Sequence, residues 1–191
     1  QTLGGDIFYN GDLSKWRKLA KSLKIKALIR ISDRDNEIAL DVAQELQALF
    51  IEGDYMTSSA DDAIFAFSDS QPNSFRMQKL RDGDFNLYVM SQTADTIYQE
   101  LNDPRFNVFF RGTGNNPNVL NGLINGIDNS QTTISVSNYS LPGTIFRENT
   151  GDLKCNFMTS WETKFLLAEA ANKGFIAGSA QSLYEDGVMD A

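Results

Sequence analysis

Few residues in this 191-residue chain could carry chemistry, because it contains no histidine and a single cysteine, Cys155. The lack of histidine excludes Ser-His-Asp triads, Cys-His pairs and histidine-based zinc sites. A lone cysteine excludes an intrachain disulfide framework and paired-cysteine metal or redox motifs. With no histidine to activate it, we expect Cys155 to be a buried core residue and not a nucleophile.

The 25 acidic residues are the remaining candidates for catalysis, since paired carboxylates can hydrolyse glycosides. Glu162 and Glu169 share one face of an expected helix, where a surface role explains them better. The stretch 82–86, Asp-Gly-Asp-Phe-Asn, begins like a calcium loop. Its sixth position is Leu87 and its twelfth is Thr93, where such a loop needs glycine and glutamate. Neither pattern defines a catalytic or metal site.

The distribution of charge is uneven along the chain. The formal net charge is −8, which argues against general nucleic-acid binding. The segment from Lys15 to Arg30 nevertheless holds seven cations and no acid, whereas the rest of the chain holds 10 cations and 25 acids. This basic run could bind an anionic ligand or an acidic partner. Because acids are abundant elsewhere, we expect its cations to pair with them instead.

Most of the elements that would position such residues are predicted to be helical. Apolar residues at spacings of three and four predict helices over about 12–31, 37–50, 91–101, 157–173 and 179–188. Caps are expected at Asp12 or Ser14, at Ser91 and at Ser179, and the third helix is expected to point Ala94, Ile97, Tyr98 and Leu101 inward. The last two are separated by a short link bracketed by Gly174 and Gly178. Such a pair forms an αα-hairpin, which is the unit of helical repeat arrays.

The first predicted helix carries two apolar stripes. The larger one includes Leu13, Trp16, Leu19 and Leu23, and the smaller one consists of Ile25 and Ile29. Two stripes indicate two packing partners, as for a helix inside a stacked array. We expect Trp16 to be buried between helices.

Residues 102–129 differ from the rest, because eight of these 28 residues are asparagine and four are glycine. This density of turn-forming residues predicts a loop that continues to about residue 150, with a short strand over 132–136. Long loops on a rigid scaffold often carry binding sites. Sugars present hydroxyl edges and apolar ring faces, so planar polar side chains near an aromatic ring suit them. The candidate ligand-binding residues are Arg111, Asn115, Asn116, Asn118 and Tyr139. Alternatively, the asparagines only satisfy the turns.

Three stretches of the chain resemble one protein family, in order and spacing. They are DIFYNGDLSKWRKLAKSLKIKALIRIS (6–32), LNDPRFNVFF (101–110) and FMTSWETKFLLAEAANKGFIAGSAQSLYEDGV (157–188). Together they resemble the SusD/RagB-like family of outer-membrane nutrient-binding lipoproteins. Lys21 departs from the pattern, since the family usually has asparagine there.

The resemblance implies a non-catalytic protein that binds glycans or other nutrients on the cell surface of Bacteroidetes-type bacteria. It implies a SusC-like TonB-dependent transporter as partner, no cofactor, and a lipid anchor on an N-terminal cysteine that this chain does not contain. The implied fold is mostly α, with tetratricopeptide-like helical hairpins, a loop-rich region and a few short strands. We expect residues 1–191 to be a single helical domain of a longer protein, with a loop-rich insertion over about 102–150.

Two alternatives remain from the sequence. The chain could be a helical-repeat adaptor that binds a protein or a peptide, in which case the matching stretches are signatures of the fold alone. It could also be a glycoside hydrolase that uses acidic residues. The sequence does not name the ligand.

Overall fold

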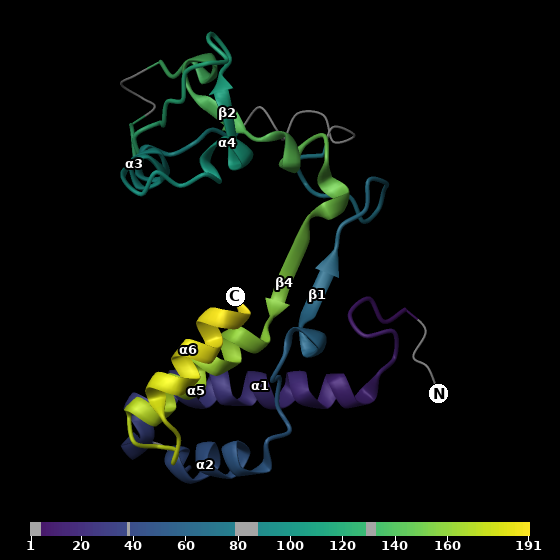
Figure 1. Ribbon diagram of the computed structural model, residues 1–191, viewed down its shortest axis with the longest axis vertical. Helices are drawn as coiled ribbons and strands as arrows, with labels where there is room; N and C mark the ends of the chain where they lie inside the picture. The colour runs from purple at the N-terminus through teal and green to yellow at the C-terminus, as the bar shows by residue number, and fades with distance from the viewer. Residues whose placement is uncertain (1–4, 38, 79–87, 129–132) are drawn as a thin grey trace. The chain divides into compact units, whose positions relative to one another are not determined.

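The computed structural model describes residues 5–37, 39–78, 88–128 and 133–191. The chain divides into two compact units (Figure 1). Unit 1 comprises Gln1–Phe65 and Cys155–Ala191, and unit 2 comprises Ala66–Lys154. Unit 2 is thus one continuous segment of chain inserted into unit 1, and it contains the loop-rich residues 102–150.

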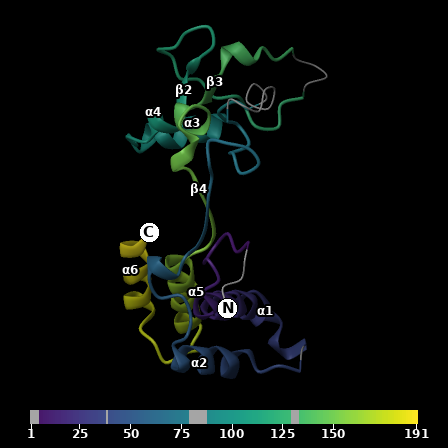
Figure 2. The same ribbon diagram turned by 90° about the vertical axis from the view of Figure 1, so that its right-hand side faces the viewer.

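Unit 1 is built mainly from four helices, as the sequence predicts. The helices are α1 (Leu13–Ile31), α2 (Val42–Glu52), α5 (Ser160–Asn172) and α6 (Ala180–Asp190). Two paired strands, β1 (Ala63–Ala66) and β4 (Lys154–Met158), lead out of unit 1 and back into it. Helices α5 and α6 lie side by side as the predicted hairpin (Figures 1 and 2), and α1 packs against both α2 and α5. The expected helical fold, with a helical hairpin and two packing partners for α1, is therefore confirmed.

Side-chain caps fix where the helices of unit 1 begin. The Asp12 carboxylate accepts hydrogen bonds from the first amides of α1, as predicted. Helix α2 begins at Val42 and not at Glu37, because Asp41 accepts from the amide of Gln44 and residues 32–37 form a 3₁₀ turn. Helix α5 begins three residues later than predicted, since Phe157 belongs to β4.

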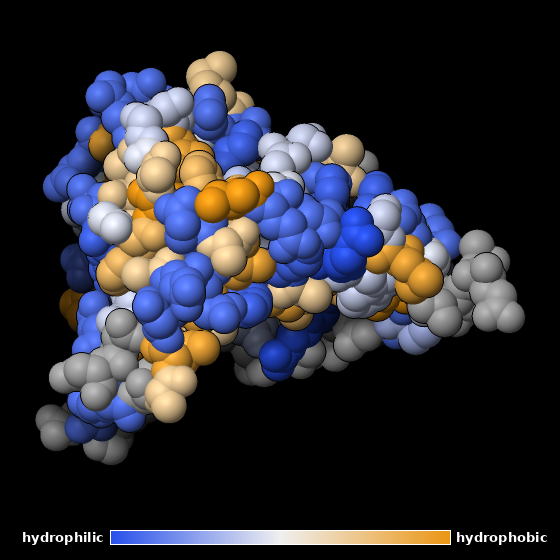
Figure 3. Space-filling model, turned by 90° about the horizontal axis from the view of Figure 1, so that it is seen from below, coloured by the Kyte–Doolittle hydropathy of each residue, from blue (hydrophilic) through white to orange (hydrophobic). Residues whose placement is uncertain are grey.

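The core of unit 1 corrects the prediction for the two stripes of α1. The helix buries Ile25 and Ile29 of the smaller stripe, together with Leu28. In the larger stripe Leu19 is buried, but Leu13 is 62% exposed and Leu23 36%. The smaller stripe is therefore buried in full and the larger one only in part. Figure 3 shows the face of unit 1 seen from below, where hydrophobic residues are interspersed with hydrophilic ones.

Trp16 is half-buried and is not enclosed between helices as predicted. Its ring meets those of Phe8 and Tyr9 edge to face, with centroid distances of 6.0 Å and 5.5 Å. Its indole Nε1 donates to Asp6. Trp16 therefore packs against the turn that precedes α1.

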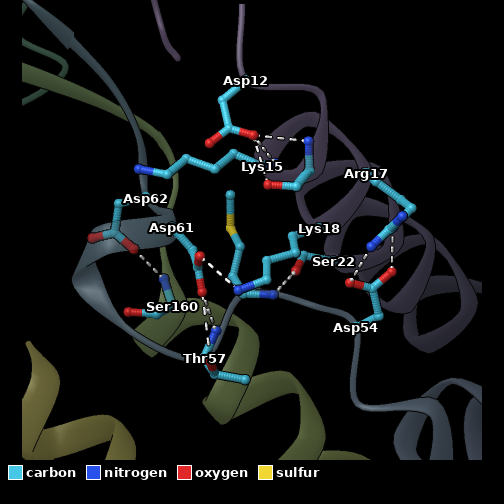
Figure 4. Close-up of polar contacts among 12 residues, drawn as sticks. Asp12, Lys15, Arg17, Lys18, Ser22, Asp54, Thr57, Asp61, Asp62 and Ser160 are labelled. Atoms are coloured by element: carbon cyan, nitrogen blue, oxygen red, sulfur yellow. Dashed lines mark hydrogen bonds and ion pairs between the residues drawn. The ribbon is translucent and has the colours of Figure 1, made fainter.

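The basic run of α1 pairs with the chain's own acids, as expected. Five of its cations contact carboxylates of unit 1 in the pairs Arg17–Asp54, Lys18–Asp61, Lys21–Glu52, Lys24–Glu45 and Lys26–Glu162. Figure 4 shows two of these pairs, Arg17–Asp54 and Lys18–Asp61, beside α1. Lys15 lies over the ring of Tyr9, 6.0 Å from its centroid. The run is thus largely neutralised inside unit 1, which removes the case for an anion site there.

A further prediction about unit 1 is wrong. Cys155 is exposed and not in the core, because it lies on β4, whose first four residues are exposed.

Helix α6 packs on α5 through a glycine. The apolar residues Tyr184 and Val188 of α6 are exposed, and Gly187 is the buried residue. A Cβ at Gly187 would lie 2.7 Å from the ring of Phe165, so this glycine allows α6 to approach α5 closely.

The described residues of unit 2 form few regular elements. They are α3 (Gln92–Glu100), α4 (Phe106–Phe109), β2 (Phe110–Thr113) and β3 (Ser140–Pro142), with 3₁₀ turns over 136–138, 144–146 and 150–152. Strands β2 and β3 are antiparallel. The predicted strand over 132–136 is wrong for the described residues 133–136, and β3 follows four residues later. Residues 136–138 form a 3₁₀ turn instead.

An aromatic cluster supports β2 in unit 2. Tyr98 of α3 stacks on Phe106 at 5.4 Å, and its ring meets those of Phe109 and Phe110 edge to face. Ser91 caps α3 as predicted. Ile97 and Leu101, which were expected to point inward, are 49% and 70% exposed. Tyr98 therefore provides most of the packing of α3, and the aromatic rings hold the strand on which Arg111 lies.

Candidate ligand-binding site

Arg111, the first candidate residue, lies on β2 at the edge of a hollow of about 380 Å³. The backbone pairs Arg111 with Leu141 of β3. The hollow is lined by Arg111, Gly112, Thr113, Gly114, Pro117, Leu141, Arg147 and Glu148. Arg111 Nη1 lies 3.3 Å from Glu148 Oε1. The hollow thus combines two guanidinium groups with one carboxylate, and we call it the arginine hollow.

The floor of the arginine hollow depends on a close approach of two backbone segments. A Cβ at Gly112 would lie 2.1 Å from the carbonyl oxygen of Pro117. Gly112 also stands at the irregularity in the β2–β3 pairing between Arg111 and Thr113. Only glycine fits here, so this residue lets the loop after β2 fold back against the strand.

Asn116 and Asn118 satisfy the turn that follows β2. The amide of Asn116 donates to Thr113 Oγ1 over 2.9 Å, and Thr113 Oγ1 donates to the carbonyl oxygen of Asn116 over 3.1 Å. Asn116 Oδ1 accepts from the amide of Asn118 at 3.0 Å. Both side chains are exposed but do not line the hollow. These contacts explain why asparagine is frequent in this segment.

Asn115 connects two loops that are distant in the sequence. Its Nδ2 donates to Asn138 Oδ1 at 2.7 Å, and its backbone amide donates to the carbonyl oxygen of Ser137 at 3.0 Å. Tyr139, the last candidate, follows directly and is half-buried. The structure therefore brings the loop of Asn115 beside the loop that ends at Tyr139. Of the five candidates, only Arg111 lines the arginine hollow.

A larger hollow of about 740 Å³ lies elsewhere on unit 2. Its lining includes residues 89–91 and 123–127 together with Ile134 and Val136. Much of this lining is aliphatic, and the exposed amide of Asn125 is one of its polar groups. Asn125 Oδ1 lies 3.4 Å from Thr93 Oγ1, and both residues also line an adjoining hollow of about 410 Å³. Size and mixed polarity suit a small organic ligand.

Tyr88 is an exposed aromatic residue that the sequence analysis missed. Its side chain is 36% exposed, and the guanidinium carbon of Arg76 lies 5.7 Å from its ring centroid. It directly precedes Val89, which lines the larger hollow. An exposed ring is a platform on which an apolar sugar face can stack. In the sequence Tyr88 belongs to a short apolar run over 87–90, a pattern that does not mark it as a binding residue.

Arg147 and Glu148 were missed as well. They follow a 3₁₀ turn, and the Arg111–Glu148 contact joins residues 37 positions apart. This contact depends on the pairing of β2 with β3, so the spacing of residues within a short stretch of sequence does not predict it.

A strong carboxylate–guanidinium pair lies near α4 and serves the fold. Asp103 accepts from Nε and Nη2 of Arg105, over distances from 2.6 Å to 3.1 Å. These hydrogen bonds, together with one from the Arg105 amide, lower the pKa of the Asp103 carboxyl. This is the Asp-Pro-Arg stretch singled out above, and it forms the turn that starts α4.

Among the described residues, few side chains are placed so that they could bind a metal. Within the described ranges, no three His, Cys, Asp or Glu side chains gather as a metal site would require. The calcium-like stretch 82–86 lies outside the described residues. Glu162 pairs with Lys26, and Glu169 lies 3.4 Å from Lys173, as helix-surface residues do. Among the helices that the structure describes, none has the length and apolar character needed to cross a membrane.

The chain belongs to the SusD-like family. All of residues 1–191 match the model of the family described as "Starch-binding associating with outer membrane". The resemblance of the three quoted stretches is thereby confirmed. A comparison with curated proteins gives no match.

Solved structures share the fold. A SusD homologue from Bacteroides fragilis matches 99% of this chain with a TM-score of 0.79 at 18% identity. Another from the same species matches 100% with a TM-score of 0.78 at 27% identity. A chitin-binding SusD homologue from Flavobacterium johnsoniae matches 97% with a TM-score of 0.68 at 24% identity. The chain spans 42%, 43% and 36% of these three structures, less than half of each.

Proposed function

We propose that the protein binds a glycan or another nutrient, without turning it over, as the accessory subunit of an outer-membrane uptake system. The observation that carries this proposal is the match of the whole chain to the starch-binding, outer-membrane-associated family. One relative of the same fold is described as chitin-binding, which supports a carbohydrate as ligand. A SusC-like transporter as partner, cell-surface exposure and an N-terminal lipid anchor are part of the same proposal.

The ligand binds to unit 2 in this proposal. Unit 2 supplies two hollows, exposed amides and an exposed tyrosine, supported by an aromatic cluster. Arg111, Asn115, Asn116, Asn118 and Tyr139 remain the proposed contacts, and Tyr88 joins them as a stacking surface. Binding without cleavage fits a chain that lacks histidine, the side chain that most often acts as a general acid or base.

The test is calorimetry of the chain against a panel of oligosaccharides, followed by analysis of the products after long incubation. We expect binding of at least one oligosaccharide and no new reducing ends. Release of reducing ends by clean protein would contradict a purely binding role.

Mutations locate the site. The combined Arg111→Ala, Asn115→Ala and Tyr139→Ala variant should bind at least about tenfold more weakly, since each 1.4 kcal/mol is a factor of ten. Asn73→Ala is the control, because it removes another exposed amide of unit 2. Unchanged affinity in a triple variant with an unchanged melting temperature would place the site elsewhere.

The adaptor alternative has one observation in its favour. A mostly apolar hollow of about 630 Å³ lies between α5 and α6, with Phe165 and Tyr184 in its lining. If no oligosaccharide binds, this surface is the one to mutate first, with Tyr184→Ala tested against peptide libraries.

A further inference from the structure

We propose that the arginine hollow is a subsite for an acidic sugar, in which the two guanidinium groups hold a carboxylate or a sulfate ester on the ring. This inference rests on the proposed glycan-binding function and names the class of glycan. It is carried by the juxtaposition of Arg111, Arg147 and Glu148 around one hollow.

The charge of the hollow contrasts with that of the protein. Its lining carries two positive charges and one negative charge, in a chain whose formal net charge is −8. Unit 2 alone has seven cations and nine acids. Among the residues that line the hollow, positive charge therefore exceeds negative charge, which favours an anionic group there.

The carboxylate that already faces Arg111 can be displaced. Arg111 Nη1 and Glu148 Oε1 are 3.3 Å apart, and their side chains are 34% and 39% exposed. Exposed pairs of this kind contribute little to stability. The fold-stabilising pair of the same unit is closer, since Arg105 Nη2 lies 2.6 Å from Asp103 Oδ2 and the Asp103 side chain is nearly buried. A ligand oxyanion can thus compete with Glu148 more easily than with Asp103, which also accepts from the Arg105 amide.

The shape of the hollow suits a ring that carries an oxyanion. Gly112 and Gly114 contribute only backbone to its wall, where Pro117 and Ser137 approach them closely. Its volume of about 380 Å³ falls in the lower part of the range for small-molecule sites. Planar guanidinium groups match carboxylate and sulfate oxygens in a bidentate manner. Leu141 and Pro117 offer the apolar contact that a ring face needs.

The experiment uses three chemically matched probes. They are the hexasaccharide of galacturonic acid, the same hexasaccharide after its carboxyl groups are reduced to alcohols, and the reduced form after chemical sulfation. Affinity for the full chain is measured by calorimetry at low and at high salt. We expect the carboxylate or the sulfate form to bind at least about tenfold tighter than the reduced form, with the preference shrinking as salt rises. The preferred probe identifies the source of the oxyanion.

Variants connect this preference with the hollow. Arg111→Gln and Arg147→Gln should each lower affinity for the charged probe severalfold more than affinity for the reduced probe, and so remove most of the preference. Glu148→Gln should strengthen binding of the charged probe severalfold, because it removes the competing carboxylate, and it provides a test even if an arginine variant misfolds. Lys154→Gln is the matched control, since it removes one exposed positive charge of unit 2 outside the lining.

The outcomes separate the two proposals. Equal affinity for the charged and reduced probes, or a preference that survives in both arginine variants, overturns the acidic-sugar subsite and leaves glycan binding intact. Failure of every oligosaccharide, including the neutral panel, overturns the proposed function and this inference together.

Discussion

Trp16 donates its indole Nε1–H to Asp6 Oδ2 over 2.8 Å, and this hydrogen bond joins the first turns of α1 to the segment before it. The Asp6 carboxylate also accepts from the amides of Phe8, Tyr9 and Gly11. One carboxylate thus organises a turn whose aromatic rings pack on the side of α1. The contact also explains the orientation of Trp16, which the apolar spacing of the helix alone does not predict.

Replacement of Asp6 by Asn should destabilise the protein in a pH-dependent way. Desolvation raises the pKa of the Asp6 carboxyl, but the hydrogen bonds from Trp16 and three amides outweigh it and lower the pKa from 3.8 to about 2. A lowered pKa in the folded state means that the stabilisation is present above the ordinary pKa and is lost as the pH falls toward about 2. The side-chain amide of asparagine has an N–H donor where the carboxylate has an acceptor, so this donor faces the N–H groups of Gly11 and Trp16.

The test measures the free energy of unfolding of the wild type and of Asp6→Asn from pH 2 to pH 7. The two values should differ most at high pH and converge at low pH. Parallel curves would contradict the role of the carboxylate.

The buried face of α1 can be tested by one pair of truncations. Ile25 is fully buried, so Ile25→Ala should cost about 2–5 kcal/mol of unfolding free energy. Leu23 lies two residues earlier on the larger apolar stripe and is partly exposed, so Leu23→Ala should cost less than about 1 kcal/mol. Denaturant melts of both variants measure the difference. Equal losses of unfolding free energy would mean that Leu23 is packed as tightly as Ile25, and would overturn the assignment of the buried face of α1.

The loop after β2 depends on Gly112. Because a Cβ there would lie 2.1 Å from the carbonyl oxygen of Pro117, Gly112→Ala must displace backbone and should lower the melting temperature by several degrees. Gly114→Ala is the matched control, since its Cβ would meet Ser137 at 3.2 Å, which a small shift relieves. Both glycines line the arginine hollow, so Gly112→Ala, which must displace more backbone, should also weaken ligand binding more than the control does. A melting temperature equal to that of the control would show that the loop can move away at little cost.

The sequence predicts the local features of this fold well. Asp12, Ser91 and Ser179 cap helices where their side chains can accept amide hydrogens, and this chemistry is local. The hairpin of α5 and α6 follows in the same way from apolar spacing and two glycines. The pairing of the basic run with acids follows from counting charges, although the partners themselves do not.

Non-local features were missed for a common reason. Which stripe of α1 is buried depends on where α2 and α5 lie, and spacing within α1 carries no such information. Cys155 is exposed because the chain pairs β1 with β4, a long-range contact between two short strands. In the candidate site, Arg111 was predicted because its side chain is of a type that suits sugars. Arg147 and Glu148 were missed because the pairing of β2 with β3 brings them near Arg111.

The ion pair of Lys18 with Asp61 should matter more for stability than its neighbours in the basic run. Asp61 is buried, and its carboxylate accepts from Lys18 Nζ at 2.8 Å and from the amide of Thr57 at 3.1 Å. Burial raises the pKa of the Asp61 carboxyl, but these hydrogen bonds lower it further than burial raises it. The charged form is therefore the one that the fold stabilises, above the ordinary carboxyl pKa.

Lys18→Met keeps the aliphatic stem but leaves the Asp61 carboxylate without its cation, so it should cost about 1.5–3 kcal/mol at neutral pH. Lys24→Met is the control, because its partner Glu45 is well exposed and the pair should be worth less than about 1 kcal/mol. Chemical denaturation at pH 7 measures both losses. In Lys18→Met, the pKa of Asp61 should rise, so the gap to the wild type should narrow as the pH falls below the ordinary carboxyl pKa. Equal losses in the two variants, or a gap that does not depend on pH, would mean that Asp61 is stabilised by its backbone contacts alone.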